Sequence, residues 1–172
     1  MARTLIGQPT VHPTHVTGSD EPAVVVVPFR EVHETALVGV VERAVRVAFA
    51  GCYAPAMIDR LVEFAARGGL ARSAAFGTML VATQADRPVG TASLEGAWIH
   101  SVYVAPDRWG RGIGRALMAA LEREARSSGR VEARLLASLP SEGFYQRVGY
   151  RTIDAHDLGV GRMIEMAKDL RT

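Results

Sequence analysis

The sequence predicts a single α/β domain in which strands and helices alternate. The 172 residues are 48% hydrophobic and 22% charged, which suffices for one hydrophobic core but not for two. Runs of β-branched residues alternate with stretches whose apolar residues recur at helical spacing. The clearest strand and helix, at 102–104 and from Ile113 onward, are joined by a glycine-rich elbow.

The N-terminal segment 1–22 is predicted to be a mobile arm, separate from a domain that spans 23–172. The arm is polar, contains Pro9 and Pro13, and lacks the apolar core of a signal peptide. Terminal disorder is favoured over a contact with substrate or with a second copy of the chain. Because Cys52 is the single cysteine, an intrachain disulfide is excluded and a cytoplasmic location is expected.

The domain begins with one strand and two helices. A strand is expected at 23–30, where four consecutive valines make both faces apolar. A long helix is expected at 31–52, and its charged side excludes a membrane span. A second helix is expected at 56–67, and Gly68 and Gly69 are expected to end it.

A hairpin and the organising helix follow. Two short β-prone runs, 78–83 and 88–94, flank a polar turn, and a third strand is expected at 98–104. The helix that begins at Ile113 carries one apolar stripe and is stopped by Gly129. After a further strand and a short helix the chain ends in a pair of strands. These last three strands are expected at 131–137, 151–154 and 162–167.

Three glycines at alternate positions, Gly110, Gly112 and Gly114, occupy the elbow where the helix opens. The first amides of a helix lack intrahelical partners and lie at the positive end of its dipole, so bare backbone there lets a phosphate approach. Arginine side chains add positive charge at the same end. They are Arg108, Arg111 and Arg115. This arrangement favours a di- or triphosphate group as ligand.

Two other glycine-rich phosphate motifs do not fit the elbow. A dinucleotide fingerprint requires glycine where the chain has Arg115 or Leu117, and a P-loop requires a Gly-Lys-Ser/Thr sequence that is absent. The segment instead resembles the pyrophosphate loop of the GNAT superfamily, the acyl-CoA-dependent N-acyltransferases, whose pattern is Gln/Arg-x-x-Gly-x-Gly/Ala. Here the residues are Trp109-Gly110-Arg111-Gly112-Ile113-Gly114, so a tryptophan stands where the family usually has Gln or Arg.

A second segment resembles the same family. Residues 144–150, Phe-Tyr-Gln-Arg-Val-Gly-Tyr, are similar to the signature Phe-Tyr-x-x-x-Gly-Phe/Tyr that follows the family's fifth strand. The two motifs occur in the family's order, with room between them for a helix and a strand. By this resemblance, which covers about 23–170, the chain is identified as a member of the GNAT superfamily.

The resemblance implies the GNAT fold, a mixed and mostly antiparallel sheet splayed between its fourth and fifth strands, with helices on both faces. It implies acetyl-CoA as co-substrate, with the pyrophosphate held chiefly by main-chain amides at 110–115. Pantetheine would pair with main chain near Val102 and Val104, whose amides could also support the oxyanion. Trp109 would alter one side-chain contact at most.

The activity implied by the resemblance is direct transfer of an acetyl or other short acyl group from acetyl-CoA to a primary amine, in a ternary complex. Tyr145 is the candidate acid, because the family's tyrosine points at the coenzyme sulfur. His100 is the candidate base, although strand alternation places it with Val102 and Val104, on a face where a lone histidine is more often packed. Glu95, in the turn before that strand, is the rival base.

Other residues are expected near the two substrates. Ser138 and Ser141 could hydrogen-bond pantetheine or cap the following helix, and capping is favoured. The junction of the first two helices would lie over the acceptor, with Ala50 and Tyr53 as pocket candidates, and Tyr53 is favoured as a buried filler of that junction. The closing loop would help to define the acceptor site through Arg162, His156 and Asp157.

The composition limits which classes of binding partner are expected. A net charge of +2 is too small to indicate nucleic acid, and no membrane partner is expected. His12 and His15 are closely spaced, but Pro13 lies between them in the arm, so no metal site is indicated. The sequence leaves the acceptor unidentified and the oligomeric state open, with a homodimer as one option. The alternative function is a non-catalytic acyl-CoA-binding sensor or scaffold.

Overall fold

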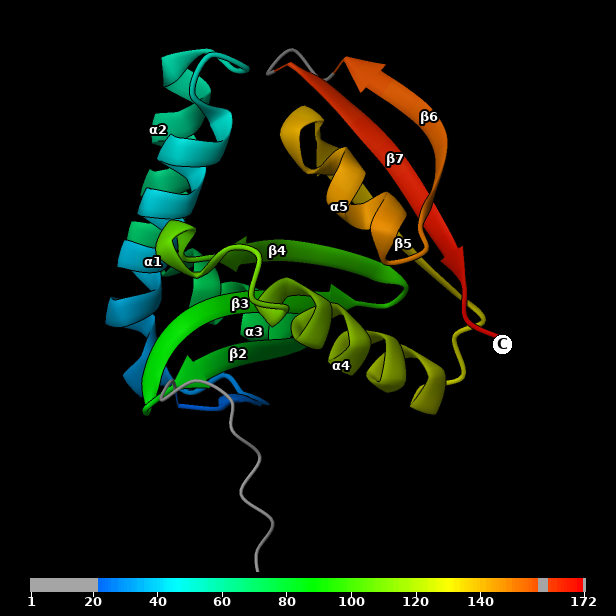
Figure 1. The fold of residues 1–172 in the computed structure, drawn as a ribbon, viewed down its shortest axis with the longest axis horizontal. Helices are drawn as coiled ribbons and strands as arrows, with labels where there is room; N and C mark the ends of the chain where they lie inside the picture. The colour runs from blue at the N-terminus through cyan, green and yellow to red at the C-terminus, as the bar shows by residue number, and fades with distance from the viewer. Residues whose placement is uncertain (1–21, 158–160, 172) are drawn as a thin grey trace, which may run out of the picture.

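The computed structural model describes residues 22–157 and 161–171, so all but the last residue of the predicted arm lies outside the described residues. In this part of the chain seven strands form one sheet in the order β1-β2-β3-β4-β5-β7-β6 (Figure 1). The strands are β1 (Val24–Pro28), β2 (Thr78–Gln84), β3 (Arg87–Glu95), β4 (Trp98–Val104), β5 (Glu132–Ser138), β6 (Arg151–Asp157) and β7 (Arg162–Asp169). The α-helices are α1 (Glu34–Phe49), α2 (Pro55–Phe64), α3 (Leu70–Phe76), α4 (Ile113–Ser127) and α5 (Glu142–Arg147).

The sheet opens between β4 and β5. These two strands are parallel and pair at two positions, Trp98 with Arg134 and Ile99 with Leu135, whereas every other pair of neighbouring strands is antiparallel. Beyond Ile99 the two strands separate, which leaves the following part of the β4 edge unpaired by β5. The predicted mixed sheet, mostly antiparallel and splayed between its fourth and fifth strands, is thus confirmed.

A bulge interrupts β4 at the start of this opening. Ser93 of β3 pairs with His100, but Thr91 pairs with Tyr103, so β4 holds one extra residue, and Ser101 has a φ of +51°. An extra residue reverses the alternation of faces along a strand. The prediction that His100 shares a face with the residues at 102 and 104 is therefore wrong, because the bulge lies between them.

Helices cover both faces of the sheet, as predicted (Figure 1). On one face α4 packs against β1 to β4, with Leu117 and Leu121 fully buried in the larger hydrophobic cluster. On the other face α1 packs against β3 and β4, and Leu37 and Val41 belong to a second cluster. The splayed end of the sheet therefore lies between two layers of apolar side chains.

The structure agrees with the predicted start and end of the helix after the elbow, but not with the predicted end of the second helix. The helix α4 begins at Ile113, and Gly129 just beyond its end adopts a φ of +75°, as a helix C-terminus favours. After α2, in contrast, Gly68 adopts a φ of +76° inside a short kinked turn, and the chain resumes as α3. A Cβ on Gly69 would lie 2.5 Å from the Phe64 ring, so this glycine permits close packing rather than ending the helix.

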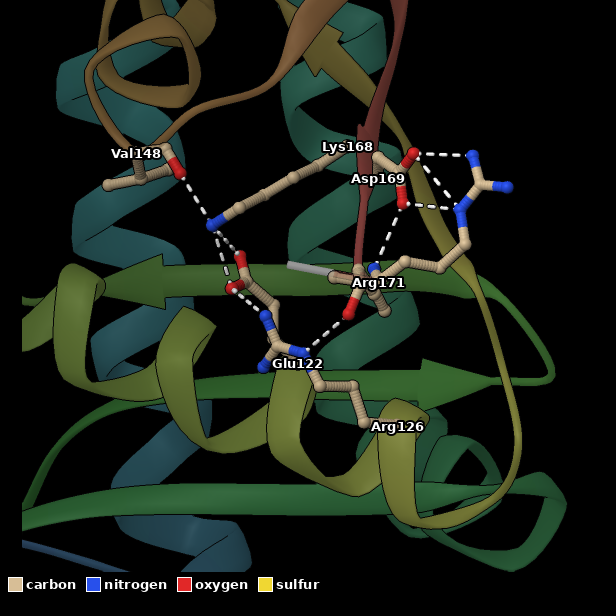
Figure 2. Close-up of polar contacts among 7 residues, drawn as sticks. Glu122, Arg126, Val148, Lys168, Asp169 and Arg171 are labelled. Carbon is tan, nitrogen blue, oxygen red and sulfur yellow. Dashed lines mark hydrogen bonds and ion pairs between the residues drawn. The ribbon is translucent and has the colours of Figure 1, made fainter.

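An ion cluster joins α4 to the C-terminal part of the sheet, as Figure 2 shows. The Nζ of Lys168 on β7 donates to both carboxylate oxygens of Glu122 on α4, at 2.9 and 2.8 Å, and to the carbonyl of Val148 at 2.8 Å. The Nε of Arg126 donates to the carbonyl of Leu170 at 2.9 Å. Glu122 is only 5% exposed, so its charge is balanced inside the molecule rather than by water.

Candidate active site

A cavity of about 870 Å³ lies where β4 and β5 separate, and it extends along the elbow to the start of α4. The predicted cofactor-binding residues that line it are Val102, Val104, Trp109, Gly110, Gly112, Ile113, Gly114, Arg115 and Ser138. His100 and Tyr145 line it as well, whereas Arg111 and Glu95 are not among its described lining residues. The structure thus brings together the two motifs that the sequence places 30 or so residues apart.

The elbow leaves backbone exposed at the N-terminal end of α4. Gly110 and Gly112 have φ values of +77° and +79°, a region that favours glycine, and a Cβ on either would meet open space. Gly112 is the N-cap of α4, and its carbonyl accepts from the amide of Ala116 at 2.9 Å. The amides of the first helical turn therefore lack intrahelical partners and point toward the elbow, an arrangement that suits an anion.

Gly114 has a different reason to lack a side chain. A Cβ at this position would lie 3.0 Å from the ring of Phe144 on α5, which is tighter than ordinary packing allows. The glycine therefore lets α5 approach the first turn of α4. The sequence assigned Gly114 to phosphate contact, and the structure adds this packing role.

Trp109 ties the elbow to the end of β4. Its indole Nε1 donates to the carbonyl of Val104 at 2.8 Å, while 47% of the side chain stays exposed at the cavity. The family resemblance implies that pantetheine pairs with main chain near Val104, and the carbonyl of this residue is already engaged through one of its two lone pairs. Tryptophan at the position where the family usually has Gln or Arg has a structural role of its own.

Tyr145 comes from α5 and faces the cavity from the β5 side of the opening. It is 6% exposed, and its ring packs against those of Phe144 and Tyr150 at centroid distances of 5.0 and 6.1 Å. Burial raises the pKa of Tyr145, and the nearby phenol of Tyr103 raises it further. The hydroxyl therefore stays protonated at neutral pH and can donate a hydrogen bond.

Tyr103 is a cavity residue that the sequence reasoning missed. It lies on β4 beyond the bulge, lines the cavity, and burial raises its pKa to about 12. Strand alternation read from the sequence alone assigned it no role. An out-of-phase polar residue at 101, beside the β-branched run, was the one sequence feature that could have indicated the bulge.

His100 lies at the bulge, where β4 and β5 begin to separate. Its side chain is exposed to the cavity and stacks on Trp98 at a centroid distance of 6.5 Å. Glu95 ends β3 and pairs in register with Trp98, at the closed end of the same hairpin. Of the two candidate bases, His100 is the one that reaches the cavity.

Ser138 and Ser141 pair with each other rather than capping a helix. Their hydroxyls are in mutual hydrogen-bond contact, and the Ser141 hydroxyl also donates to the Ser138 carbonyl at 3.2 Å. Neither side chain makes a capping hydrogen bond. The favoured capping role is therefore wrong, while both residues line the cavity.

Tyr53 fills the helix junction, as the favoured interpretation held. Its hydroxyl donates to the carbonyl of Arg162 at 2.9 Å and accepts from the amide of Leu139 at 2.9 Å, which links the α1–α2 junction to the start of β7 and to the turn that follows β5. Neither Tyr53 nor Ala50 is a described lining residue of the cavity. His156 contacts Glu165 at 2.9 Å, away from the cavity.

A second, smaller cavity of about 260 Å³ adjoins the first on the α1–α2 side of the sheet. The two cavities share seven lining residues, which are Ile99, His100, Ser101 and Tyr103 of β4 together with Leu61, Leu136 and Met163. Among the described lining residues of both, the charged side chains are Arg108, Arg115 and Arg147, and no aspartate or glutamate takes part. The site is therefore positively charged at its elbow and apolar at its other end.

Residues 75–152 match the family described as an acetyltransferase (GNAT) domain. The fold is similar to that of a GCN5-related N-acetyltransferase from Rhodopseudomonas palustris, with a TM-score of 0.77 and 24% identity over 90% of this chain and 99% of that one. It is also similar to the PaiA N-acetyltransferase of Thermoplasma acidophilum in complex with coenzyme A, with a TM-score of 0.74 and 19% identity over 86% and 99% of the chains.

An aminoglycoside 6′-N-acetyltransferase complexed with coenzyme A has a TM-score of 0.61 and 17% identity over 86% of this chain and 98% of that one. No curated protein matches the sequence. Residues 75–152 thus belong to the GNAT acetyltransferase family, and the described chain as a whole has the GNAT fold.

Two further observations concern metal binding and membrane-spanning helices. Within residues 22–157 and 161–171, no group of three or more His, Cys, Asp or Glu side chains is placed to hold a metal ion. In the same ranges, the helices are too short or too polar to cross a bilayer.

Proposed function

We propose that the protein transfers an acetyl or other short acyl group from acetyl-CoA to a primary amine, directly within a ternary complex. The observation that carries this proposal is a single cavity that joins the bare elbow of α4 to Tyr145 and His100. The phosphate-accepting end and the candidate acid and base are thus parts of one continuous site. The match of residues 75–152 to the GNAT acetyltransferase domain supports the same reaction class.

The elbow fits the diphosphate of coenzyme A. Gly110 and Gly112 present open backbone, and the unpartnered amides of the first turn of α4 supply donors at the positive end of the helix dipole. Arg115, which lines the cavity at the same end, adds charge. The unpaired edge of β4 near Val102 would supply main-chain partners for the pantetheine arm.

Acetyl-CoA, when bound, supplies an activated thioester carbonyl. Tyr145 would donate a hydrogen bond to the departing thiolate, since its raised pKa keeps the phenol protonated. A phenol this weakly acidic is better suited to stabilise the thiolate by hydrogen bonding than to ionise itself. Backbone amides near Val102 would support the developing oxyanion.

His100 would take the proton of the attacking amine, directly or through water. It is the one histidine among the described lining residues of either cavity, and no lining carboxylate competes with it. Glu95 stays the rival on sequence grounds alone.

We also propose a cytoplasmic location, in keeping with the single exposed Cys52. A homodimer is the option for the oligomeric state, which sedimentation would test.

Calorimetry with acetyl-CoA, followed by thiol-release assays over a panel of amines, tests this proposal. Binding followed by release of coenzyme A with at least one amine is the expected result. Binding without turnover on any amine would favour the sensor or scaffold alternative, and absence of binding would reject both.

A further inference from the structure

The lining of the second cavity bears on which kind of amine the site takes as acceptor. The inference about the acceptor rests on the proposed acyl transfer. The cavity lies beyond His100, on the side of the sheet away from α4, and its walls come from α1, α2 and α3 together with β4, β5 and β7. It meets the larger cavity at the bulge of β4. An amine that enters here would reach the candidate base from the side opposite the elbow.

The walls of the second cavity are apolar. Val41 and Leu70 are buried in the core, while Phe64 and Leu136, which also line this cavity, are 45% and 39% exposed overall. Large apolar side chains gathered around a hollow and left open to solvent are typical of a surface that a ligand covers. The volume, about 260 Å³, is below the roughly 300–1,000 Å³ that holds drug-sized ligands.

The charges around the two cavities disfavour an acceptor with a second positive charge. No carboxylate takes part among the described lining residues of either cavity, so a second ammonium group of the acceptor would be desolvated without an anionic partner. The guanidinium of Arg72 lies 5.4 Å from the centroid of the Phe64 ring but lines neither cavity. A polycationic acceptor is therefore disfavoured at this site.

We propose that the acceptor is a small primary monoamine with an apolar aliphatic or aromatic body, and that Phe64 is a specificity-determining residue for it. The apolar body fills the second cavity, and the amino group lies toward His100 at the bulge of β4. Polyamines and aminoglycosides are excluded by their additional charges and, for aminoglycosides, by their size.

The direct test compares amines that differ by one charge. Hexylamine and 1,6-diaminohexane have the same carbon chain, and 2-phenylethylamine, spermidine and kanamycin complete the panel. Thiol release with acetyl-CoA is expected to give a kcat/KM for hexylamine and 2-phenylethylamine roughly tenfold or more above that for 1,6-diaminohexane. Equal or better turnover of the diamine, spermidine or kanamycin would overturn the proposed acceptor class while leaving acyl transfer intact.

If no amine is turned over, the proposed function fails, and binding still decides the acceptor cavity. Calorimetric titration of the coenzyme A-loaded protein with hexylamine and with 1,6-diaminohexane should then show tighter binding of hexylamine. Equal binding of the two amines, or binding of neither, would overturn the inference.

Phe64 supplies the matched variants, because it lines the second cavity but not the first. The Phe64→Ala variant should raise the KM for hexylamine roughly tenfold, with kcat and acetyl-CoA affinity unchanged, since the whole phenyl ring is lost from the wall. Phe64→Leu should restore most of the affinity. A Phe64→Ala protein with the parental KM would remove Phe64 from the proposal, and a fall in kcat or melting temperature alone would indicate a structural role.

Discussion

The two ends of α4 handle their polar groups in opposite ways. At the N-terminal end, Gly112 and the first-turn amides face open space beside the cavity. In the C-terminal half, Glu122 is almost fully buried and contacts Lys168 and, at 3.9 Å, Arg126 (Figure 2). Groups at the first end are left for a ligand to satisfy, whereas groups at the second end are satisfied within the chain.

This difference separates binding from stability along one helix. The ion cluster holds α4 to β7 at the end where β4 and β5 still pair, and the elbow lies at the end where they have separated. Changes at the elbow should therefore act mainly on ligand affinity and, apart from local backbone strain at the glycines, little on folding. Changes in the cluster should do the reverse.

The largest expected effect is loss of acetyl-CoA binding in Gly112→Val. Valine at a φ of +79° is strained by about 1–3 kcal/mol and places a branched side chain where the ligand would meet backbone. Gly129→Val is the matched control, because Gly129 has a φ of +75°, also faces open space, and lies at the other end of the same helix. Calorimetry should detect no binding to the first variant and parental affinity in the second. Equal affinities in both variants would reject the elbow as the ligand site.

The second prediction concerns the candidate acid. Tyr145→Phe keeps the packed ring but removes the hydroxyl, so turnover should fall by roughly a hundredfold, within the range of 10² to 10⁴ typical of general acid–base catalysis. Tyr150→Phe is the control, since that hydroxyl lies beside Glu122 in the ion cluster. Full activity of Tyr145→Phe in steady-state assays would remove the proposed acid.

The third prediction separates the two candidate bases. In His100→Ala the acidic limb of the pH profile of kcat/KM should vanish, and the remaining rate should rise steadily with pH as free amine accumulates. Glu95→Gln, at the closed end of the hairpin, should keep the parental profile. Persistence of the acidic limb in His100→Ala would leave Glu95 or solvent as the base.

The fourth prediction tests the other end of α4. Lys168→Met leaves the buried Glu122 carboxylate without its closest partner, so the free energy of unfolding should fall by about 3 kcal/mol in urea denaturation. Arg171→Met breaks an exposed pair with Asp169 and should shift the denaturation midpoint little. Acetyl-CoA affinity should stay at the parental level in both variants. A Lys168→Met protein that loses affinity without losing stability would contradict the separation.

A smaller effect, on the stability of the fold, is expected at alkaline pH. Burial raises the pKa of Tyr103 to about 12 and also raises the pKa values of Tyr145 and Tyr150, the latter with a contribution from the Glu122 carboxylate. The neutral phenols are therefore favoured in the folded state, so this stabilisation is complete below pH 10 and is lost as the pH rises above it. Denaturation midpoints measured from pH 8 to 11.5 should decline above pH 10, while the tyrosinate absorbance rises. A midpoint that stays flat across this range would contradict the raised values.

Local chemistry explains what the sequence could predict. The end of β4 at Val104, the start of α4 at Ile113 and the end of that helix before Gly129 depend on neighbouring residues, and each prediction agrees with the structure. The fold and the grouping of the elbow with Tyr145 followed from two motifs together.

Non-local contacts explain what the sequence could not predict. The bulge at Ser101 depends on pairing with β3, and it changed which side chains share a face with His100. Two other misses are local in sequence: Gly69 packs against Phe64 in the kinked turn before α3, and the Ser138–Ser141 contact takes the place of a helix cap. The second cavity is formed by helices and strands far apart in the sequence, so no motif marks it.

The most direct test of the contrast along α4 is a titration of the ¹⁵N-labelled protein with acetyl-CoA, followed by amide chemical shifts. The account predicts the largest shifts at the amides of Gly112 to Arg115, with downfield proton shifts as these donors acquire a phosphate acceptor. The amides of Glu122 to Arg126 should change little. Shifts concentrated around Glu122, or no shifts at the elbow upon saturation, would contradict the assignment of the open end of α4 to the coenzyme.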